Sequence, residues 1–323
     1  MLELKRGVKV VSEGITLPDG NVMQVLEEEG YKYLGVLQLD KPLYEEMRQK
    51  ISSEYIRRIK ALCRSKLNSG NLTTGINAWA IGVIRYSAGI IEWRKEDLQK
   101  LDRKTRKILT MNRKLHPRSS VARLYLKRKE GGRGMISVEE CVEAESKGLF
   151  DYLEQSHEDL LVFARNEEVL KEDESKIAYK NRVREENHNK WKTKPLHGQY
   201  MRDIEGKTDE DSWRWLRNGY LKPETEGMIL AAQEQSLHTR AIQAKIDKKA
   251  ISPMCRMCGQ AEETNMHIVS ACSKIAQTWM KERHDKLATH VHWELCKKYG
   301  IECSEKWYEH TATYVENDLV EIT

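Results

Sequence analysis

The sequence lacks a long hydrophobic run, and it contains only two phenylalanines and six prolines among its 323 residues. Its most apolar stretch, residues 75–91, is interrupted by polar side chains and is too short to span a bilayer, which needs about 20 consecutive apolar residues. We therefore expect no membrane contact. The two phenylalanines, beside eight tryptophans and thirteen tyrosines, favour helical packing over a large β core.

Seven cysteines, an odd number, occur without an opening segment that resembles a signal peptide. This pattern predicts a reducing compartment, in which thiols bind metal or lie buried. We expect an intracellular protein of the nucleus or the cytoplasm. Cys63 and Cys141 fall on the apolar faces of expected helices and are predicted to be inert core thiols.

Positive charge is concentrated in one part of the chain. Between Arg85 and Arg133 there are 16 Lys and Arg against 5 Asp and Glu. Because the net charge of the chain is +5, the remaining residues together carry about −6. A concentrated basic segment is typical of proteins that bind polyanions. The positive charge can also be explained as the solvated face of a helix that binds no ligand.

The periodicity predicts a mainly α-helical fold. Residues 75–91 are apolar on nearly all sides, which predicts a buried central helix with other helices around it. Glycines recur in this stretch at a spacing of seven, and a neighbouring helix is expected to pack closely against them: Gly75, Gly82 and Gly89. Other helices are expected at residues 43–67, 95–112, 138–153, 171–192, 211–218, 223–248 and 274–299. The helix at 138–153 would begin with a capping box made by Ser137 and Glu140.

The order of the expected elements along the chain predicts five regions. Residues 1–40 form a small antiparallel β element, with strands at 8–11, 15–17, 22–25 and 31–37 around a Pro-Asp-Gly-Asn turn, at the edge of a larger sheet. Helical domains follow at 41–155 and 156–250, the second of them an acidic linker. Residues 251–312 form a small metal-binding domain with a helix, and residues 313–323 are expected to be a frayed or truncated tail.

One cysteine and histidine pattern has the spacing of a metal site. Cys255, Cys258, His267 and Cys272 follow the spacing C-x2-C-x8-H-x4-C, and Gly259 suits the tight turn after the first pair. Three thiolates and one imidazole can close a tetrahedron around zinc, which would then be structural because no ligand position stays open. Chance clustering of these residues is the alternative. His284 and Cys296 are reserve ligands.

Several segments of the chain resemble the non-LTR retrotransposon reverse transcriptases of the site-specific, restriction-like-endonuclease class. Residues 31–36 (YKYLGV) resemble the strand that follows the catalytic palm, and residues 93–110 resemble the thumb helix. Residues 124–137 resemble the LYxPRxxGGRGLxS segment, with Lys127 where the family often has proline. The cysteine–histidine pattern is similar to the CCHC knuckle that precedes the endonuclease. The resemblance implies a palm edge, a thumb-like domain at 41–155, a linker and a zinc knuckle.

Neither catalytic centre of that family is expected here. Polymerisation requires carboxylates that hold two metal ions, and the sequence contains no paired-aspartate motif of the F/YxDD kind. The endonuclease that the resemblance places after the knuckle is missing because the chain stops at Thr323. The sequence therefore predicts no enzyme, with no catalytic residues.

The resemblance and the charge together imply binding of a template–primer duplex of RNA, DNA or both, with other retroelement proteins as further partners. Phosphate contacts are expected from the thumb and from a glycine-rich loop: Arg103, Lys104, Arg106, Lys107, Arg113, Lys114, Lys127, Arg128, Lys129 and Arg133. The knuckle would add Arg256 or Lys274. A non-catalytic helical protein-interaction module with a structural zinc site is the alternative, and a gene remnant without function is a third possibility.

Overall fold

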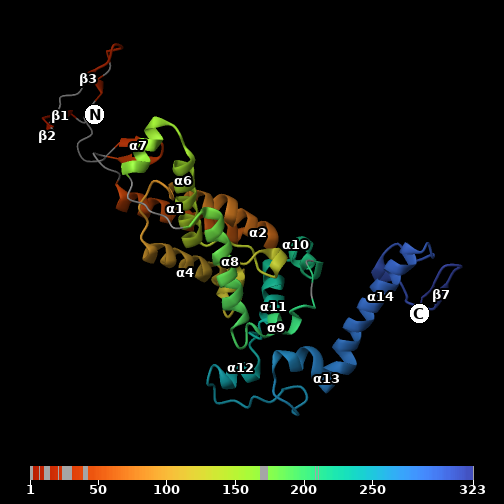
Figure 1. The fold of residues 1–323 in the computed structure, drawn as a ribbon. Helices are drawn as coiled ribbons and strands as arrows, with labels where there is room; N and C mark the ends of the chain where they lie inside the picture. The colour runs from red at the N-terminus through yellow and green to blue at the C-terminus, as the bar shows by residue number, and fades with distance from the viewer. Residues whose placement is uncertain are drawn as a thin grey trace. The chain divides into compact units, whose positions relative to one another are not determined.

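The computed structural model describes residues 3–6, 8–10, 15–20, 22–23, 31–38, 43–167, 174–207, 209 and 211–322 (Figure 1). The protein is mainly helical, as the sequence predicts. It divides into two compact units, Met1–Leu230 and Ala231–Thr323, which are described separately below. The predicted helical domain at 41–155 and most of the predicted linker fall within the first of these units.

The first unit contains most of the helices. Its helices are α1 (Tyr44–Arg64), α2 (Ser69–Gly75), α3 (Ile81–Ser87), α4 (Lys95–Met111), α5 (Val121–Tyr125), α6 (Val138–Gln155), α7 (Asp159–Glu167), α8 (Lys176–Lys192), α9 (Gln199–Ile204), α10 (Arg214–Asn218) and α11 (Pro223–Gln233), whose last residues belong to the second unit. Short turns of other helix types are η1 (Ile76–Ala80), η2 (Arg128–Glu130) and η3 (Asp211–Trp213).

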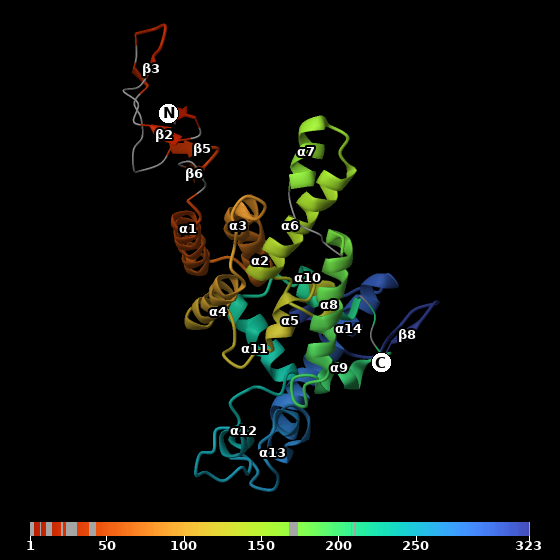
Figure 2. The same ribbon diagram turned by 60° about the vertical axis from the view of Figure 1, so that its left-hand side comes forward.

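The core of the first unit is built around the segment that runs through α2, η1 and α3. Ile76, Ile81 and Ile84 on this segment are fully buried. Helices α1 and α6 contact α3, and α4 packs against both α1 and α6, so that these helices lie side by side (Figure 2). The predicted central helix is therefore present, although it begins earlier, at Ser69, where the Asn68 side chain accepts a hydrogen bond from the Asn71 N–H.

Two of the three predicted glycine contacts occur. A Cβ atom on Gly75 would lie 3.0 Å from Leu62 of α1, and one on Gly89 would lie 2.9 Å from Leu149 of α6. Gly82 has no atom within 4 Å of the corresponding position, so the prediction of close packing is wrong there. The two buried thiols are as predicted: Cys63 and Cys141 lie in this core, and burial raises the pKa of each to about 11.

The N-terminal β element consists of two-stranded antiparallel hairpins over the described residues. The pairs are β1 (Glu3–Lys5) with β2 (Val8–Val10), β3 (Ile15–Thr16) with β4 (Val22–Met23), and β5 (Tyr31–Tyr33) with β6 (Val36–Gln38). The predicted single strand at 31–37 is wrong, because Leu34 and Gly35 both have positive φ and turn the chain back on itself, as a tight hairpin requires. Val11, Gln24 and Val25, which were expected to lengthen two strands, are outside the described residues.

Helix α6 begins as the sequence predicts, with the Ser137 hydroxyl accepting a hydrogen bond from the Glu140 N–H at 3.0 Å. Helix α8 packs against α5 and α6 and begins at Lys176 after the Ser175 cap; residues 171–173 of its predicted range lie outside the described part of the chain. The predicted helix at 223–248 is two helices, α11 and α12 (Arg240–Lys245). The chain turns between them at Gln235, where φ is +53°.

The second unit contains α12, η4 (His267–Ala271), α13 (Ser273–Ile275), η5 (Ala276–Met280), α14 (Lys281–Lys298), η6 (Trp307–Glu309) and the hairpin of β7 (Val315–Glu316) with β8 (Glu321–Ile322). The predicted amphipathic helix at 274–299 is interrupted by the π-helical turn η5. The sequence periodicity predicts an inward-facing stripe of Ile275, Trp279, Leu287, Val291 and Leu295 in this segment. This prediction is wrong at three positions, because Trp279, Leu287 and Val291 are exposed. Residues 313–323, expected to fray, form the β7–β8 hairpin, in which Ile322 is buried.

Candidate metal centre and cationic face

The four predicted metal ligands come together in the second unit. Cys255 and Cys258 lie on a turn that is closed by a hydrogen bond of 2.9 Å from the Gly259 N–H to the Cys255 carbonyl, and Gly259 has a φ of +66°. His267 starts the π-helical turn η4, and Cys272 follows that turn directly, with its N–H donating to the His267 carbonyl at 2.8 Å. The wider turn of η4 thus sets the spacing between the last two ligands.

The ligand atoms of this cluster have the separations of a tetrahedral site. The Sγ atoms of Cys255 and Cys272 are 3.9 Å apart, and Cys258 Sγ is 3.3 Å from His267 Nε2. All four ligand atoms lie within 4.8 Å of one another. Zinc–sulfur bonds of about 2.3 Å and zinc–nitrogen bonds of about 2.0 Å give tetrahedral edges of roughly 3.5–3.8 Å. The cluster could therefore hold a metal ion.

Backbone N–H groups favour the thiolate form of the first two cysteines. The Gln260 N–H lies 3.5 Å from Cys258 Sγ and lowers the pKa of that thiol. Burial opposes ionisation of Cys255, but the N–H groups of Cys258 and Met257 outweigh it and lower the pKa of Cys255. Burial raises the pKa of Cys272. Since metals bind thiolates, the turn is arranged to supply two of them.

A buried carboxylate supports the turn from behind. Glu263 is 1% exposed and accepts hydrogen bonds from the Arg256 guanidinium at 2.5 and 2.8 Å and from the backbone N–H groups of Arg256 and Arg240 at 3.0 Å. The Arg256 guanidinium lowers the pKa of this carboxyl to about 2. Glu263 thus joins the cysteine turn to the start of α12. The Arg256 side chain, expected to reach nucleic acid, is paired with Glu263 and is 54% exposed.

The two reserve ligands lie elsewhere. His284 is exposed on α14 and lies 3.2 Å from Asp285. Cys296 is buried farther along the same helix, beside His292 and His310. Neither residue belongs to the group of four that could hold a metal.

Helix α4 separates the buried and cationic sides of the basic segment. Leu98, Leu101 and Leu109 are buried in the core. Asp102, also buried, accepts hydrogen bonds from the first N–H groups of α6, at 2.8 Å from Val138 and 3.3 Å from Glu139. Burial raises the pKa of Asp102 to about 6. These contacts hold α4 rigidly against α6.

The opposite side of α4 carries unpaired cations. Arg103, Lys104 and Lys107 are exposed, and none has an ion-pair partner among the residues that the structure describes. Lys107 lies one turn beyond Arg103 on the same side of α4, whereas Lys104 lies about 100° around the helix from Arg103. Lys104 also lines a recess of about 350 Å³ between α4 and α1, together with Arg57 and Lys60 of α1. Lys60 was not among the predicted site residues, although it lies off the apolar stripe of its helix.

The other predicted phosphate contacts differ in their partners and in their exposure. Arg106 donates a hydrogen bond of 2.8 Å to the Tyr125 hydroxyl, and Lys114 lies 2.8 Å from Glu224, whose pKa it lowers. Arg113 is exposed at the end of α4. In the loop, Lys127 and Lys129 are exposed.

Two of the predicted loop contacts are internal, which corrects the sequence prediction. Arg133 is 5% exposed and lies 3.2 Å from the Glu226 carboxylate, which is itself 1% exposed. Arg128 pairs with the same carboxylate and donates to the Leu216 carbonyl at 2.8 Å. Ser69 adds a hydrogen bond of 2.5 Å to Glu226. We call these four residues the Glu226 cluster; it joins the glycine-rich loop to α2 and α11, and its arginines are not available to a ligand.

The role of Glu226 is not evident from the sequence, because a carboxylate near the start of a helix indicates only a favourable interaction with the helix dipole. The glycines of the loop serve the same packing. A Cβ atom on Gly132 would lie 2.1 Å from the Leu126 carbonyl oxygen, and one on Gly131 would lie 2.7 Å from the Trp213 ring. The segment 127–134 is therefore a packed element of the first unit.

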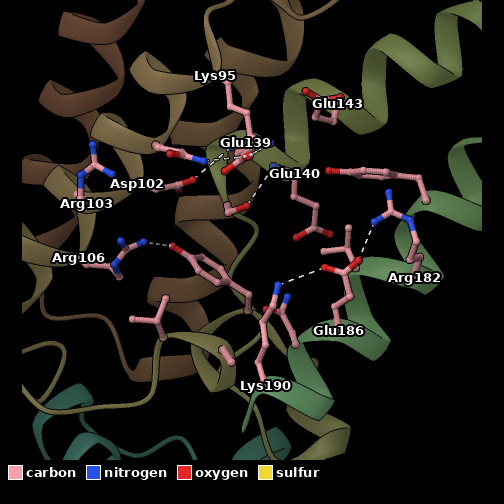
Figure 3. A pocket seen from close by; sticks show the side chains of 18 of the residues that line it. Lys95, Asp102, Arg103, Arg106, Glu139, Glu140, Glu143, Arg182, Glu186 and Lys190 are labelled. Atoms are coloured by element: carbon pink, nitrogen blue, oxygen red, sulfur yellow. Dashed lines mark hydrogen bonds and ion pairs between the residues drawn. The ribbon is translucent and has the colours of Figure 1, made fainter. Parts of the chain in front are cut away.

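A groove of about 910 Å³ is lined by α4, α5, α6 and α8 (Figure 3). On its α8 side, Arg182 and Lys190 converge on Glu186, at 2.7 and 3.1 Å. On its α4 side, Arg103 and Arg106 lie near the acidic floor formed by residues such as Asp102. Since carboxylates and cations both line it, the groove carries mixed charge.

No helix in the described part of the chain is both long enough and apolar enough to cross a membrane. No model of a known protein family matches the chain, and a search of curated proteins also gives no match.

Proposed function

We propose that this protein binds the phosphate backbone of a nucleic-acid duplex through the exposed cations of α4 and the neighbouring part of α1. The supporting observation is the contrast within the basic segment. Arg128, Arg133 and Lys114 have carboxylate partners, whereas Arg103, Lys104 and Lys107 have none among the described residues. Cations without an internal partner can contact phosphate without first breaking an ion pair.

The helix beneath these cations is fixed by burial. Leu98 and Leu101 pack in the core, and Asp102 binds the start of α6. A helix rises about 1.5 Å per residue, so the Cα atoms of Arg103 and Lys107 lie about 6 Å apart along the axis of α4. Contacts of this kind position a duplex and carry little sequence information.

The resemblance to the thumb of non-LTR retrotransposon reverse transcriptases supports a template–primer duplex as the ligand. We propose a non-catalytic role as the chain stands, in agreement with the lack of a paired-aspartate motif in the sequence. For the cluster of Cys255, Cys258, His267 and Cys272 we propose Zn²⁺. Four protein ligands would leave no open position, so the ion would stabilise the fold of the second unit without contacting a substrate.

Salt dependence tests the proposal. The variant Arg103→Gln, Lys104→Gln, Lys107→Gln is compared with wild type in binding to a DNA duplex over a range of salt concentrations. Each lost phosphate contact lowers the slope of log K against log salt by about 0.9, so we expect a reduction of about 2.7. Between about 50 and 200 mM salt, three contacts account for roughly 40-fold of the loss of affinity.

A second variant controls for net charge. Lys207→Gln, Lys248→Gln and Lys249→Gln remove the same three charges from exposed positions outside α4. We expect the slope of log K against log salt for this control to differ from the wild-type slope by no more than about 0.9, the value of one phosphate contact. A wild-type slope near zero, or equal slopes for the two triple variants, would refute the proposal.

A protein-interaction role is the second candidate, and it is favoured by exposed apolar side chains on α6 and α7. Tyr152, Leu160 and Phe163 are 58%, 82% and 65% exposed. Purified duplex binding decides between the candidates: if the chain captures protein partners and binds no duplex at any salt concentration, this second role replaces the first.

A further inference from the structure

Three ligand-type side chains meet in the second unit, apart from the cysteine turn. His292 and Cys296 lie one turn apart on α14, and His310 follows η6. His292 Nδ1 is 2.8 Å from His310 Nε2 and 3.4 Å from Cys296 Sγ. The three ligand atoms all lie within 4.8 Å of one another. None of them was predicted to act together with the other two.

The backbone orients the central imidazole. His292 Nε2 lies 2.7 Å from the Thr313 carbonyl oxygen, which can only accept a hydrogen bond. The proton of His292 is therefore on Nε2, and the lone pair of Nδ1 faces Cys296 and His310. A ring N–H bound to a carbonyl is the usual support of a histidine that ligates metal through its other nitrogen.

The local fold has few buried apolar side chains. Between residues 281 and 322 only His292, Cys296 and Ile322 are buried, so almost no apolar core holds α14 against the segment that follows it. Small structures of this kind are commonly stabilised by a metal ion. The two histidines and the cysteine occupy the position where an ion would join α14 to the segment after η6.

We propose that His292, Cys296 and His310 bind a second transition-metal ion of the zinc class, with water in the fourth position. Around zinc, tetrahedral edges are about 3.3 Å between nitrogens and about 3.6 Å between nitrogen and sulfur. The observed separations of 2.8 and 3.4 Å reach these values by movements of a few tenths of an ångström. Imidazole and thiolate ligands select zinc over magnesium or calcium.

A hydrogen-bonded group without metal is the competing explanation. In that arrangement His310 Nε2–H donates to His292 Nδ1, and no ion is bound. The two explanations predict different metal contents and different ligands of the bound zinc. They also differ in whether replacing His310 lowers the zinc content.

Metal content of the purified full-length chain provides the first test. We expect two zinc ions per chain in wild type and one in His310→Asn and in Cys296→Ser. His284→Asn, which changes an exposed histidine on the same helix, is the matched control and is expected to keep two ions. Wild type with one ion or none, or an unchanged content in His310→Asn, overturns the proposal.

X-ray absorption of the wild-type zinc protein provides a test that needs no variant to fold. The cysteine turn alone gives three sulfur ligands per ion, whereas the two sites together give an average of two. A shell of two sulfurs supports the second site, and a shell of three overturns it. Neither result depends on duplex binding, so this proposal can fail or succeed independently of the proposed function.

Discussion

The Glu226 cluster gives the clearest prediction of stability. Glu226→Gln keeps the size of the side chain but removes the carboxylate that Arg128 and Arg133 share inside the protein. Removing one partner of a buried ion pair costs about 3–5 kcal/mol, because the remaining charge stays in a poorly solvated position. In the first unit this corresponds to a fall in Tm of roughly 6–20 °C, at about 2–4 °C for each kcal/mol.

The assay is urea unfolding followed by tryptophan fluorescence, with thermal unfolding as a second measurement. Glu224→Gln is the matched control, since Glu224 lies two residues away and its carboxylate, which pairs with Lys114, is 45% exposed. Because water solvates this carboxylate, we expect its loss to cost about 1 kcal/mol or less. Arg133→Gln is then made in wild type and in Glu226→Gln.

The second substitution is expected to cost less in the Glu226→Gln background, because the two side chains are coupled. If Glu226→Gln costs less than about 1 kcal/mol, or if the two losses simply add, the assignment of a structural role to the two arginines is wrong.

Three further predictions concern the packing of α4, of the glycine-rich loop and of α3. Burial raises the pKa of Asp102 from 3.8 to about 6, so between these values the folded protein holds a proton that the unfolded chain has released. From about pH 4 to pH 7, wild type is expected to lose up to roughly 3 kcal/mol of unfolding free energy relative to Asp102→Asn, measured by urea unfolding at each pH. Gly132→Ala is expected to destabilise strongly in thermal unfolding, because its Cβ would lie 2.1 Å from the Leu126 carbonyl. Gly82→Ala, with open space at the same position on α3, is expected to stabilise by up to about 1 kcal/mol.

Each of these predictions is tested by a comparison between two of the proteins named above. Parallel pH profiles of wild type and Asp102→Asn would contradict the assigned effect of burial on Asp102. Equal melting temperatures for Gly132→Ala and Gly82→Ala would contradict the close approach described at Gly132.

The features that the sequence predicts well are local ones. The run at 75–91 is apolar on nearly all sides wherever the helix boundaries fall, so the burial of Ile81 and Ile84 follows from composition alone. Ser137 and Glu140 are three residues apart, and the cap needs nothing else. The four residues of the cysteine turn lie within a short stretch, and a turn and one helical turn are enough to bring their ligand atoms together.

The failed predictions depend on distant or backbone-specific information. Arg128 and Arg133 look like surface cations in the sequence because their partner, Glu226, is 98 residues beyond Arg128. Alternation over residues 31–37 does not show that Leu34 takes a positive φ. The chain turns at Gln235, after α11, without a glycine or a proline, and the apolar side chains of Trp279 and Leu287 are exposed although the periodicity favours their burial.

The Glu226 cluster also constrains how the chain folds during synthesis. Ser69 precedes its carboxylate partner by 157 residues, and the loop with Arg133 is complete long before α11 leaves the ribosome. Contacts of such long sequence separation form late because the intervening chain must first be made and ordered. The nascent chain therefore carries its two arginines without their shared counter-charge until residue 226 emerges, and the first unit can complete its native packing only from that moment.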